Sequence, residues 1–295
     1  MMDPKCELVR MVTADELELQ GLLFEPDGSS GAKTALIHVH GWAGNFYENL
    51  FIDDLARKAV NEGVAFLAAL NRGAGIVSDI ISMKGAKRGY ERIGGCIEKF
   101  EDSVLDIRAA IDFLAARGYG NIILEGHSLG CQKVAYYMYK TKDERVRGLV
   151  FLAPVDDASY VKRRLLERYD ESIDVAKRMV RDGEGSDAVP SWMAFYPLLT
   201  AKRFLDLSDP KTMHGRMFYY GGGLDEIRRV VCPCLAVFGS RDDYEAEPEK
   251  KLVIIKKAMK RCDTVLVDDA DHWFFGHEDE MAKTVFMWIG KKAAP

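Results

Sequence analysis

The sequence lacks the long apolar runs and the excess of basic residues that mark membrane proteins and nucleic-acid-binding proteins. No apolar run in the 295 residues approaches the 18 residues expected of a membrane-spanning helix. Lysine and arginine number 41 against 46 acidic residues, and the net charge is −5. We therefore expect no nucleic-acid partner and no membrane partner. There is also no internal repeat or low-complexity tract that would indicate a repeat protein.

Cysteine is sparse, and the amino terminus lacks the features of a signal peptide. The six cysteines are scattered over the whole chain, which favours reduced thiols over a disulfide framework. The first residues have no apolar segment before a small-residue cleavage site, so we expect no signal peptide. Together these features predict a cytoplasmic protein. The oligomeric state is left open, and a homodimer is one alternative.

The remaining composition is that of an ordinary globular protein, with 48% apolar and 29% charged residues. Short apolar runs alternate with amphipathic stretches of helical period. Predicted strands cover residues 8–12, 17–24, 35–40, 64–70, 121–125, 148–153, 234–238 and 264–267. Predicted helices cover residues 47–60, 100–114, 247–260 and 278–290, together with one that begins near Ser128. This alternation predicts an α/β fold with a mostly parallel eight-stranded sheet and helices on both faces.

Two stretches depart from the alternation. Residues 73–95 are rich in glycine and serine and are expected to form a long loop. Residues 156–225 carry helical patterns and three prolines, and they end in three consecutive glycines. We expect 156–225 to be a helical cap inserted after the sixth strand of a core made of residues 1–155 and 226–295.

The strongest motif is Gly-His-Ser-Leu-Gly at residues 126–130, between a predicted strand and a predicted helix. This is the pattern of a nucleophile elbow, in which a sharp turn exposes the serine hydroxyl and the flanking glycines leave room for it. The alternative is a plain strand–helix turn with a capping serine. Ser128 is the candidate nucleophile.

A serine hydroxyl needs a general base and an acid that orients the base, and in this arrangement they follow in the order Ser, acid, His. Asp242 comes three residues after the glycine that ends the strand at 234–238, and Asp243 is the alternative acid. His272 follows the strand at 264–267. Taken singly, Asp242 could be a turn residue and His272 a surface histidine. Their order and their places at strand ends favour a triad of Ser128, Asp242 and His272.

Attack on a carbonyl creates an oxyanion, which requires fixed N–H donors. The backbone N–H of Leu129, directly after the nucleophile, is one candidate. The other is the backbone N–H of Trp42 in the glycine-bounded turn at residues 40–44. The alternative for that turn is an ordinary glycine turn after a strand.

These motifs resemble the α/β-hydrolase superfamily over nearly the whole chain. The matching segments are 40–44 (HGWAG), 71–75 (NRGAG), 126–130 (GHSLG), 239–242 (GSRD) and 270–274 (ADHWF). In the second segment Asn71 stands where that superfamily commonly has an acid. Within the superfamily the chain is most similar to serine hydrolases of the carboxylesterase and cinnamoyl-esterase type, in which a Phe occupies the place of Trp42. A local and weaker similarity extends through residues 128–132 to a group that contains fungal siderophore esterases.

The other histidines compete less well for the role of base. His38 and His40 share one strand face, but no Asp-His pair follows at the spacing of a metallohydrolase, so we expect no metal. Residues 73–75 (GAG) lack the third glycine of a dinucleotide-binding fingerprint, so we expect no cofactor. His127 adjoins the nucleophile, and its side chain is expected to point away from the site.

The sequence predicts a serine esterase that acts on a small-molecule ester with a small, medium or aromatic acyl group. Residues 192–220 hold seven aromatic residues and three methionines, which could line an acyl pocket or form the cap's own core. The alternatives are a peptidase or an acyltransferase with the same triad, or a binding module on the same fold. The acyl and alcohol groups are not predicted.

Overall fold

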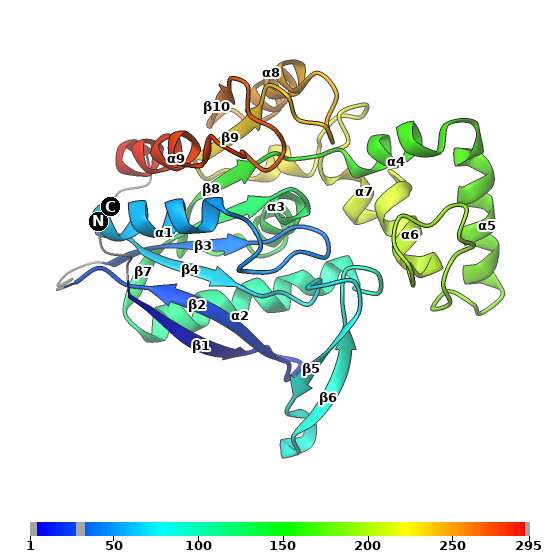
Figure 1. Cartoon of the computed structure of the whole chain (residues 1–295), viewed down its shortest axis with the longest axis horizontal. Helices are drawn as coiled ribbons and strands as arrows, with labels where there is room; N and C mark the ends of the chain where they lie inside the picture. The colour runs from blue at the N-terminus through cyan, green and yellow to red at the C-terminus, as the bar shows by residue number, and fades with distance from the viewer. Residues whose placement is uncertain (1–4, 28–32, 293–295) are drawn as a thin grey trace.

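The computed structural model describes residues 5–27 and 33–292, in which strands and helices form a layered α/β architecture (Figure 1). The first four residues, which belong to the segment expected to hold no signal peptide, lie outside the described residues. The strands of the main sheet are β1 (Cys6–Val12), β2 (Glu18–Phe24), β3 (Lys33–Val39), β4 (Ala65–Ala69), β7 (Tyr119–His127), β8 (Val146–Leu152), β9 (Cys234–Gly239) and β10 (Cys262–Val267).

These eight strands lie in the order β1-β2-β4-β3-β7-β8-β9-β10. Strand β2 is antiparallel to β1 and β4, and every other neighbouring pair is parallel. The described residues thus confirm the predicted eight-stranded, mostly parallel sheet. Strands β4 and β9 are buried at every position, which explains why their sequences are continuous apolar runs without alternation.

Helices cover both faces of this sheet (Figure 1). They are α1 (Phe51–Asn61), α2 (Ser103–Ala116), α3 (Leu129–Thr141), α8 (Pro248–Ala258) and α9 (Glu278–Lys292). Helix α1 packs against α9, and α2 packs against α3. A Cβ on Gly148 of β8 would lie 2.8 Å from Trp288 of α9, whereas a Cβ on Gly126 of β7 would meet the backbone of α3. Gly126 pairs with Phe151, three residues beyond Gly148, so the two glycines face opposite sides of the sheet.

The prediction of a long loop over residues 73–95 is wrong in part. Strands β5 (Ser78–Ser82) and β6 (Gly89–Ile93) form an antiparallel hairpin that projects from the core (Figure 1). Few of their side chains are buried, so the apolar alternation that indicates a strand is faint in the sequence. Short 3₁₀ turns cover Lys84–Ala86, Phe100–Asp102, Leu166–Arg168 and Ile227–Arg229.

Residues 156–225 lie between β8 and β9 and contain four helices, joined by turns and by an irregular stretch at residues 182–200. The helices are α4 (Asp157–Leu165), α5 (Tyr169–Arg181), α6 (Ala201–Ser208) and α7 (Met213–Met217). They stand beyond the carboxyl ends of the parallel strands (Figure 1). Most of the residues in a second apolar cluster, which includes Phe204 and Leu207, come from this segment. We call residues 156–225 the helical insertion. Among the described residues no helix is long and apolar enough to cross a membrane.

Candidate active site

Ser128 occupies a sharp turn between the end of β7 and the start of α3. Its backbone has φ 54° and ψ −125°, a conformation that a non-glycine residue rarely adopts and that is associated with functional strain. A Cβ on Gly126 would lie 2.3 Å from the Gly130 backbone, and a Cβ on Gly130 would lie 1.9 Å from the Val39 carbonyl oxygen. Both glycines of the motif are therefore sterically required. The serine is presented at the carboxyl end of a central parallel strand.

His272 and Asp242 are hydrogen-bonded to each other. Nδ1 of His272 lies 2.9 Å from Oδ2 of Asp242, and both side chains are almost completely buried. The other oxygen of Asp242 accepts backbone N–H bonds from Tyr244 and Glu245, each at 2.9 Å. With Nδ1–H donating to the carboxylate, Nε2 is the basic nitrogen of the imidazole. Asp243, the alternative acid in the sequence, is exposed.

The turn after β3 lies directly against the nucleophile. A Cβ on Gly41 would lie 3.0 Å from Cβ of Ser128 and 3.4 Å from the backbone nitrogen of Leu129. The indole N–H of Trp42 donates to the carbonyl oxygen of Gly95 at 2.7 Å, which holds the turn from its outer side. The two backbone amides predicted as oxyanion donors, those of Trp42 and Leu129, therefore belong to segments that are in contact.

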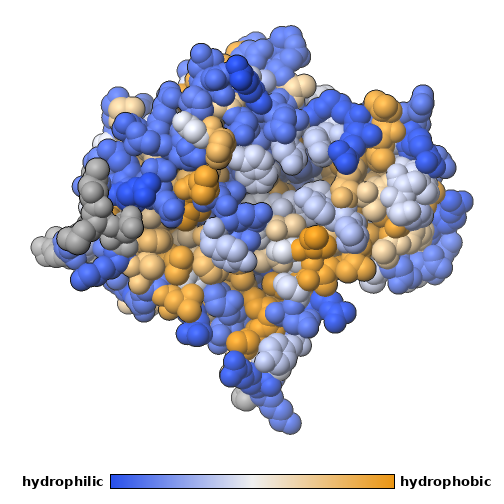
Figure 2. Space-filling model, viewed as in Figure 1, coloured by the Kyte–Doolittle hydropathy of each residue, from blue (hydrophilic) through white to orange (hydrophobic). Residues whose placement is uncertain are grey.

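Ser128, His272 and Trp42 line one cavity of about 470 Å³ between the core and the helical insertion. Its walls are rich in aromatic side chains, contributed by both parts: Trp42, Tyr160, Phe195, Tyr196, Tyr244 and Trp273. On the face in Figure 2, apolar side chains gather across the middle of the molecule, including the region between the core and the insertion, while hydrophilic side chains cover most of the periphery. A cavity of this size and lining suits a small molecule with an apolar or aromatic part.

Of the seven aromatic residues at 192–220, some line the active-site cavity and others pack in the interior of the protein. Phe195 and Tyr196 line the cavity and contact Trp42 edge-to-face, with ring centroids 6.2 and 5.0 Å away. Phe204 and Phe218 are fully buried and belong to the packing of the protein. Beside the candidate base, Trp273 lines the cavity, whereas Phe274 is buried beneath the loop.

The prediction that the His127 side chain points away from the site is wrong. Its Nε2 lies 2.9 Å from the backbone carbonyl oxygen of His272, and the two imidazole centroids are 4.9 Å apart. His127 is buried and its pKa lies well below the ordinary value because burial disfavours the charged ring, so it acts as a neutral donor. It therefore holds the loop that carries the candidate base. Its neighbouring position in the sequence gives no indication of this contact.

The two histidines of β3 have structural partners. Nδ1 of His38 lies 2.5 Å from Oε2 of Glu125, and Nε2 of His40 accepts the backbone N–H of Asn71 at 3.1 Å. Burial lowers the pKa of His40 to about 3, which keeps its ring neutral. Within residues 5–27 and 33–292 no group of three or more His, Cys, Asp or Glu side chains is arranged to hold a metal ion. The expected absence of a metal stays a prediction.

A buried ionic network joins the helical insertion to the core, and no motif in the sequence indicates it. Glu98 accepts from Lys133 Nζ of α3 and from Arg203 Nη2 of α6, both at 2.8 Å, and all three side chains are fully buried. Arg203 Nη1 contacts Nδ1 of His214 at 2.9 Å, and His214 Nε2 contacts Asp157 at 2.8 Å. Burial alone would raise the pKa of Glu98, but the two cations outweigh it and hold the pKa below its ordinary value.

This network reaches the turn that carries Trp42. Arg203 Nε donates to the Gly95 carbonyl oxygen at 2.9 Å, and the Trp42 indole donates to the same oxygen. Lys133 Nζ also donates to Oδ1 of Asn71 at 2.9 Å. Asn71, noted in the sequence because it replaces a common acid, therefore faces a buried lysine. The network contacts the insertion and the candidate oxyanion turn at the same time.

The two ends of the helical insertion are joined beside Asp242, the candidate acid. The backbone N–H of Asp156 donates to Oε2 of Glu245 at 2.8 Å, and the Asp156 carboxylate accepts from the backbone N–H of Tyr220 at 3.0 Å. Glu245 is three residues from Asp242 and donates its own backbone N–H to that carboxylate. Burial raises the pKa of Glu245 to about 7.

The raised pKa of Glu245 predicts a specific dependence of stability on pH. The pKa of Glu245 is about 7 in the folded state and about 4.5 in its ordinary state. Below pH 4.5 the protonated side chain therefore stabilises the fold, and this contribution is lost as the pH rises through 7. Glu245→Gln mimics the neutral acid, so at pH 8 we expect it to be more stable than the wild type by about 3 kcal/mol. The difference should disappear near pH 4. Urea unfolding at several pH values measures this, with exposed Glu249→Gln as the control; equal stabilities of variant and wild type at pH 8 would contradict it.

Solved structures of other proteins have the same fold as this chain. Est1E from Butyrivibrio proteoclasticus is 15% identical, with 98% of this chain and 99% of that one covered and a TM-score of 0.64. The Pyrococcus furiosus esterase Pf2001 is 17% identical, with 99% and 92% covered and a TM-score of 0.63. DcsB, in complex with its substrate analogue, is 14% identical, with 99% and 100% covered and a TM-score of 0.68. The chain has the α/β-hydrolase fold.

More narrowly, the chain belongs to the family DUF1749, which is described as a protein of unknown function. The family model matches residues 94–287, which is 194 of the 295 residues. The matched range includes Ser128, Asp242 and His272, whereas the turn with Trp42 precedes it. A comparison with curated protein sequences gave no significant match.

Proposed function

We propose that this protein is a serine hydrolase that cleaves carboxylic esters through an acyl-enzyme intermediate. The observation that carries the proposal is the His272–Asp242 hydrogen bond of 2.9 Å, formed at the wall of the same cavity that contains Ser128 in its strained turn. A nucleophile, a base and an orienting acid are the minimum set for acyl transfer by a serine. The esterases among the similar structures agree with this chemistry.

In the proposed reaction Ser128 is the nucleophile and His272 transfers the protons. His272 Nε2 removes the proton of the Ser128 hydroxyl as its oxygen attacks the ester carbonyl, and Asp242 stabilises the imidazolium that forms. Backbone N–H groups of Trp42 and Leu129 stabilise the oxyanion. Collapse of the tetrahedral intermediate releases the alcohol, which takes the proton from His272. Water then attacks the acyl-enzyme with His272 again as base, and the carboxylic acid is released.

The aromatic lining of the cavity favours an aromatic acyl group. Trp42, Phe195 and Tyr196 form one wall, and Tyr160 stacks on Tyr244 at 5.3 Å on another. Flat rings pack against such walls edge-to-face or in offset stacks. Est1E, a similar structure, binds ferulic acid, which is an aromatic acid. In this role the helical insertion would act as a cap over the acyl group.

A substrate panel tests the proposed function. We expect the wild-type protein to hydrolyse p-nitrophenyl esters, with aromatic acyl groups preferred over linear acyl groups of similar size because rings match the cavity walls. Peptide anilides should be cleaved far more slowly. A preference for anilides would indicate a peptidase, ester formation with an added alcohol in place of hydrolysis would indicate an acyltransferase, and no turnover of any ester would favour a binding module.

A further inference from the structure

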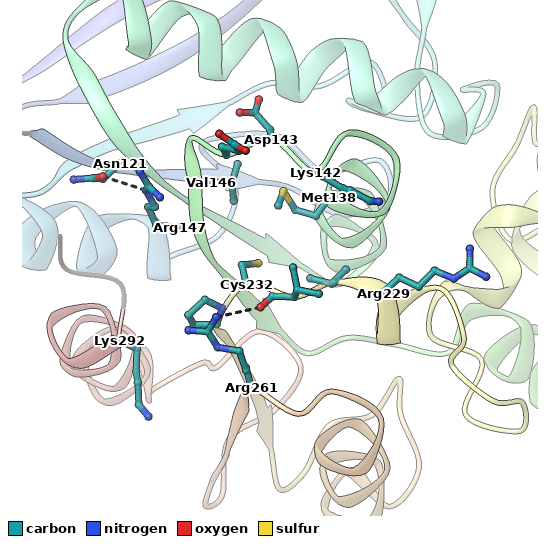
Figure 3. A pocket seen from close by; sticks show the side chains of 14 residues that line it. Asn121, Met138, Lys142, Asp143, Val146, Arg147, Arg229, Cys232, Arg261 and Lys292 are labelled. Carbon is teal, nitrogen blue, oxygen red and sulfur yellow. Dashed lines mark hydrogen bonds between the residues drawn. The ribbon is translucent and has the colours of Figure 1, made fainter.

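A second cavity lies at the amino-terminal ends of β7, β8 and β9, whereas Ser128 follows the carboxyl end of β7. Figure 3 shows the side chains that line this cavity. It has a volume of about 820 Å³ and is larger than the candidate active-site cavity. Asn121 and Arg147 line it near the first residues of β7 and β8, and Cys232 and Pro233 line it just before β9. Because Ser128 follows the last residue of β7, most of the length of that strand separates the two cavities. The proposed hydrolysis makes no use of this second cavity.

The walls of this cavity carry an excess of positive charge. Its cationic residues are Lys142, Arg147, Arg229, Arg261 and Lys292. The acids on the same walls are Asp143 and Glu144. The charge of the Asp143 carboxylate is already balanced by Arg145, which donates to it together with the Tyr137 hydroxyl. These bonds lower the pKa of Asp143 to about 2. A chain with a net charge of −5 therefore concentrates cations in one concave place.

Most of these cations have no acidic partner. Only Lys292 has a carboxylate within 4.0 Å, that of Asp263 at 3.8 Å; for the other four, the described part of the chain provides none. Arg147 Nε donates to the Asn121 amide oxygen at 3.4 Å, and Arg261 Nη1 donates to the Val231 carbonyl oxygen at 3.3 Å (Figure 3). These acceptors are neutral, so they orient both guanidinium groups without cancelling their charge. The remaining N–H groups of both are left for another acceptor.

The composition of the walls indicates the chemical class of that acceptor. Three of the five cations are arginines, whose planar forks match phosphate oxygens in bidentate geometry. The positive charges on this concave surface repel one another. Together they attract a compact anion that carries more than one negative charge. One part of the wall is apolar and includes Met138, Val230 and Val231. A ligand that joins phosphate groups to an apolar or ring-shaped part can contact both the cationic side and the apolar side of this cavity.

We propose that this cavity is a binding site for an organic phosphate that carries at least two phosphate groups, such as a nucleoside diphosphate. Arg147 and Arg261 contact the phosphates from two different walls, and the apolar wall contacts the organic part. The site is independent of the proposed ester hydrolysis, because none of its residues belongs to the triad or to the candidate oxyanion turn.

Titration calorimetry of the wild-type protein tests this with ADP, pyrophosphate, citrate and adenosine as separate probes. We expect ADP to bind, with a Kd that rises with ionic strength, and adenosine and citrate to bind at least about tenfold more weakly. Pyrophosphate that binds as tightly as ADP would still support the site and would assign recognition to the phosphates alone. Equal binding of citrate and ADP, or no binding of ADP and pyrophosphate at millimolar concentration, would overturn the proposal.

Arginine variants locate the binding. Arg147→Met and Arg261→Met keep the aliphatic length and lie on the surface, so we expect a normal fold and unchanged ester hydrolysis. Each should weaken ADP binding by about tenfold, the loss expected for one charge-assisted contact. Arg88→Met is the matched control, because Arg88 is an exposed arginine near the β5–β6 hairpin. Equal Kd values for ADP binding by all three variants would contradict the location of the ADP site in this cavity.

Cys232 gives a local readout. It lines the cavity and is partly exposed, and the neighbouring Cys234 thiol holds the pKa of Cys232 below its ordinary value, so alkylation should be fast. Cys6 is also exposed and is removed by Cys6→Ser, while the other four cysteines are buried. Saturating ADP should slow alkylation of Cys232 several-fold. An unchanged alkylation rate in the presence of bound ADP would place the ligand elsewhere.

Discussion

Asp242→Asn is expected to lower kcat for ester hydrolysis by about 10⁴-fold, whereas Asp243→Asn is expected to change it less than twofold. The Asp242 carboxylate lies 2.9 Å from Nδ1 of His272 and fixes the tautomer in which Nε2 is basic. An asparagine amide at that place can donate to Nδ1 and so stabilise the wrong tautomer. Asp243 is exposed and adjacent in the chain, which makes it a matched control for the same substitution. Steady-state kinetics with a p-nitrophenyl ester measures both effects.

The pH dependence separates this catalytic effect from a local disturbance. If Asp242 acts through His272, the loss should be confined mainly to kcat, with KM changed little, and the apparent pKa of the kcat profile should shift. A variant that merely loosened the loop would raise KM instead. Nearly full activity of Asp242→Asn, or an equal loss in Asp243→Asn, would contradict the assigned triad.

Glu98→Gln is expected to destabilise the protein by about 3–5 kcal/mol. The substitution keeps the shape of the side chain but leaves the ammonium of Lys133 and the guanidinium of Arg203 buried without an anion between them. An uncompensated buried charge is costly because neither water nor a counter-ion can reach it. Urea unfolding of wild type and variant measures the difference in free energy of unfolding.

Glu171→Gln is the control for this prediction. Glu171 pairs with Arg168 on the surface of the insertion, with both side chains about half exposed. Exposed ion pairs of this kind stabilise a protein by less than about 1 kcal/mol. A loss in Glu98→Gln no larger than the loss in Glu171→Gln would show that the buried network does not hold the insertion to the core.

The sequence carried enough information to predict the sheet and the candidate triad, because both depend on local signals. Central strands are apolar runs bounded by glycine, and the elbow is a five-residue pattern whose glycines have a steric reason visible in the structure. The acid and the base follow later strands in a fixed order. The position of Asp242 three residues after the strand-ending glycine favoured it over Asp243, but adjacent residues are hard to tell apart in a sequence. In the structure Asp242 is buried and hydrogen-bonded to His272, whereas Asp243 is exposed.

What could not be predicted depends on contacts between distant segments. Glu98, Lys133 and Arg203 look like ordinary surface charges in the sequence, yet they meet across separations of 35 and 105 residues in a fully buried cluster. His127 faces His272 because the loop after β10 folds over the elbow, which no local pattern indicates. Most side chains of the β5–β6 hairpin are exposed, so its sequence lacks the apolar alternation that indicates strands.

The proposed reaction depends on Ser128 as the nucleophile, and one experiment tests this most directly. The best p-nitrophenyl ester of the panel is assayed with wild type and Ser128→Ala, and both are treated with a fluorophosphonate and analysed by peptide mass spectrometry. We expect Ser128→Ala to lose at least about 10³-fold in kcat and the fluorophosphonate to label Ser128 alone in the wild type. Full hydrolytic activity in Ser128→Ala, or an unlabelled Ser128 in an active protein, would contradict the account.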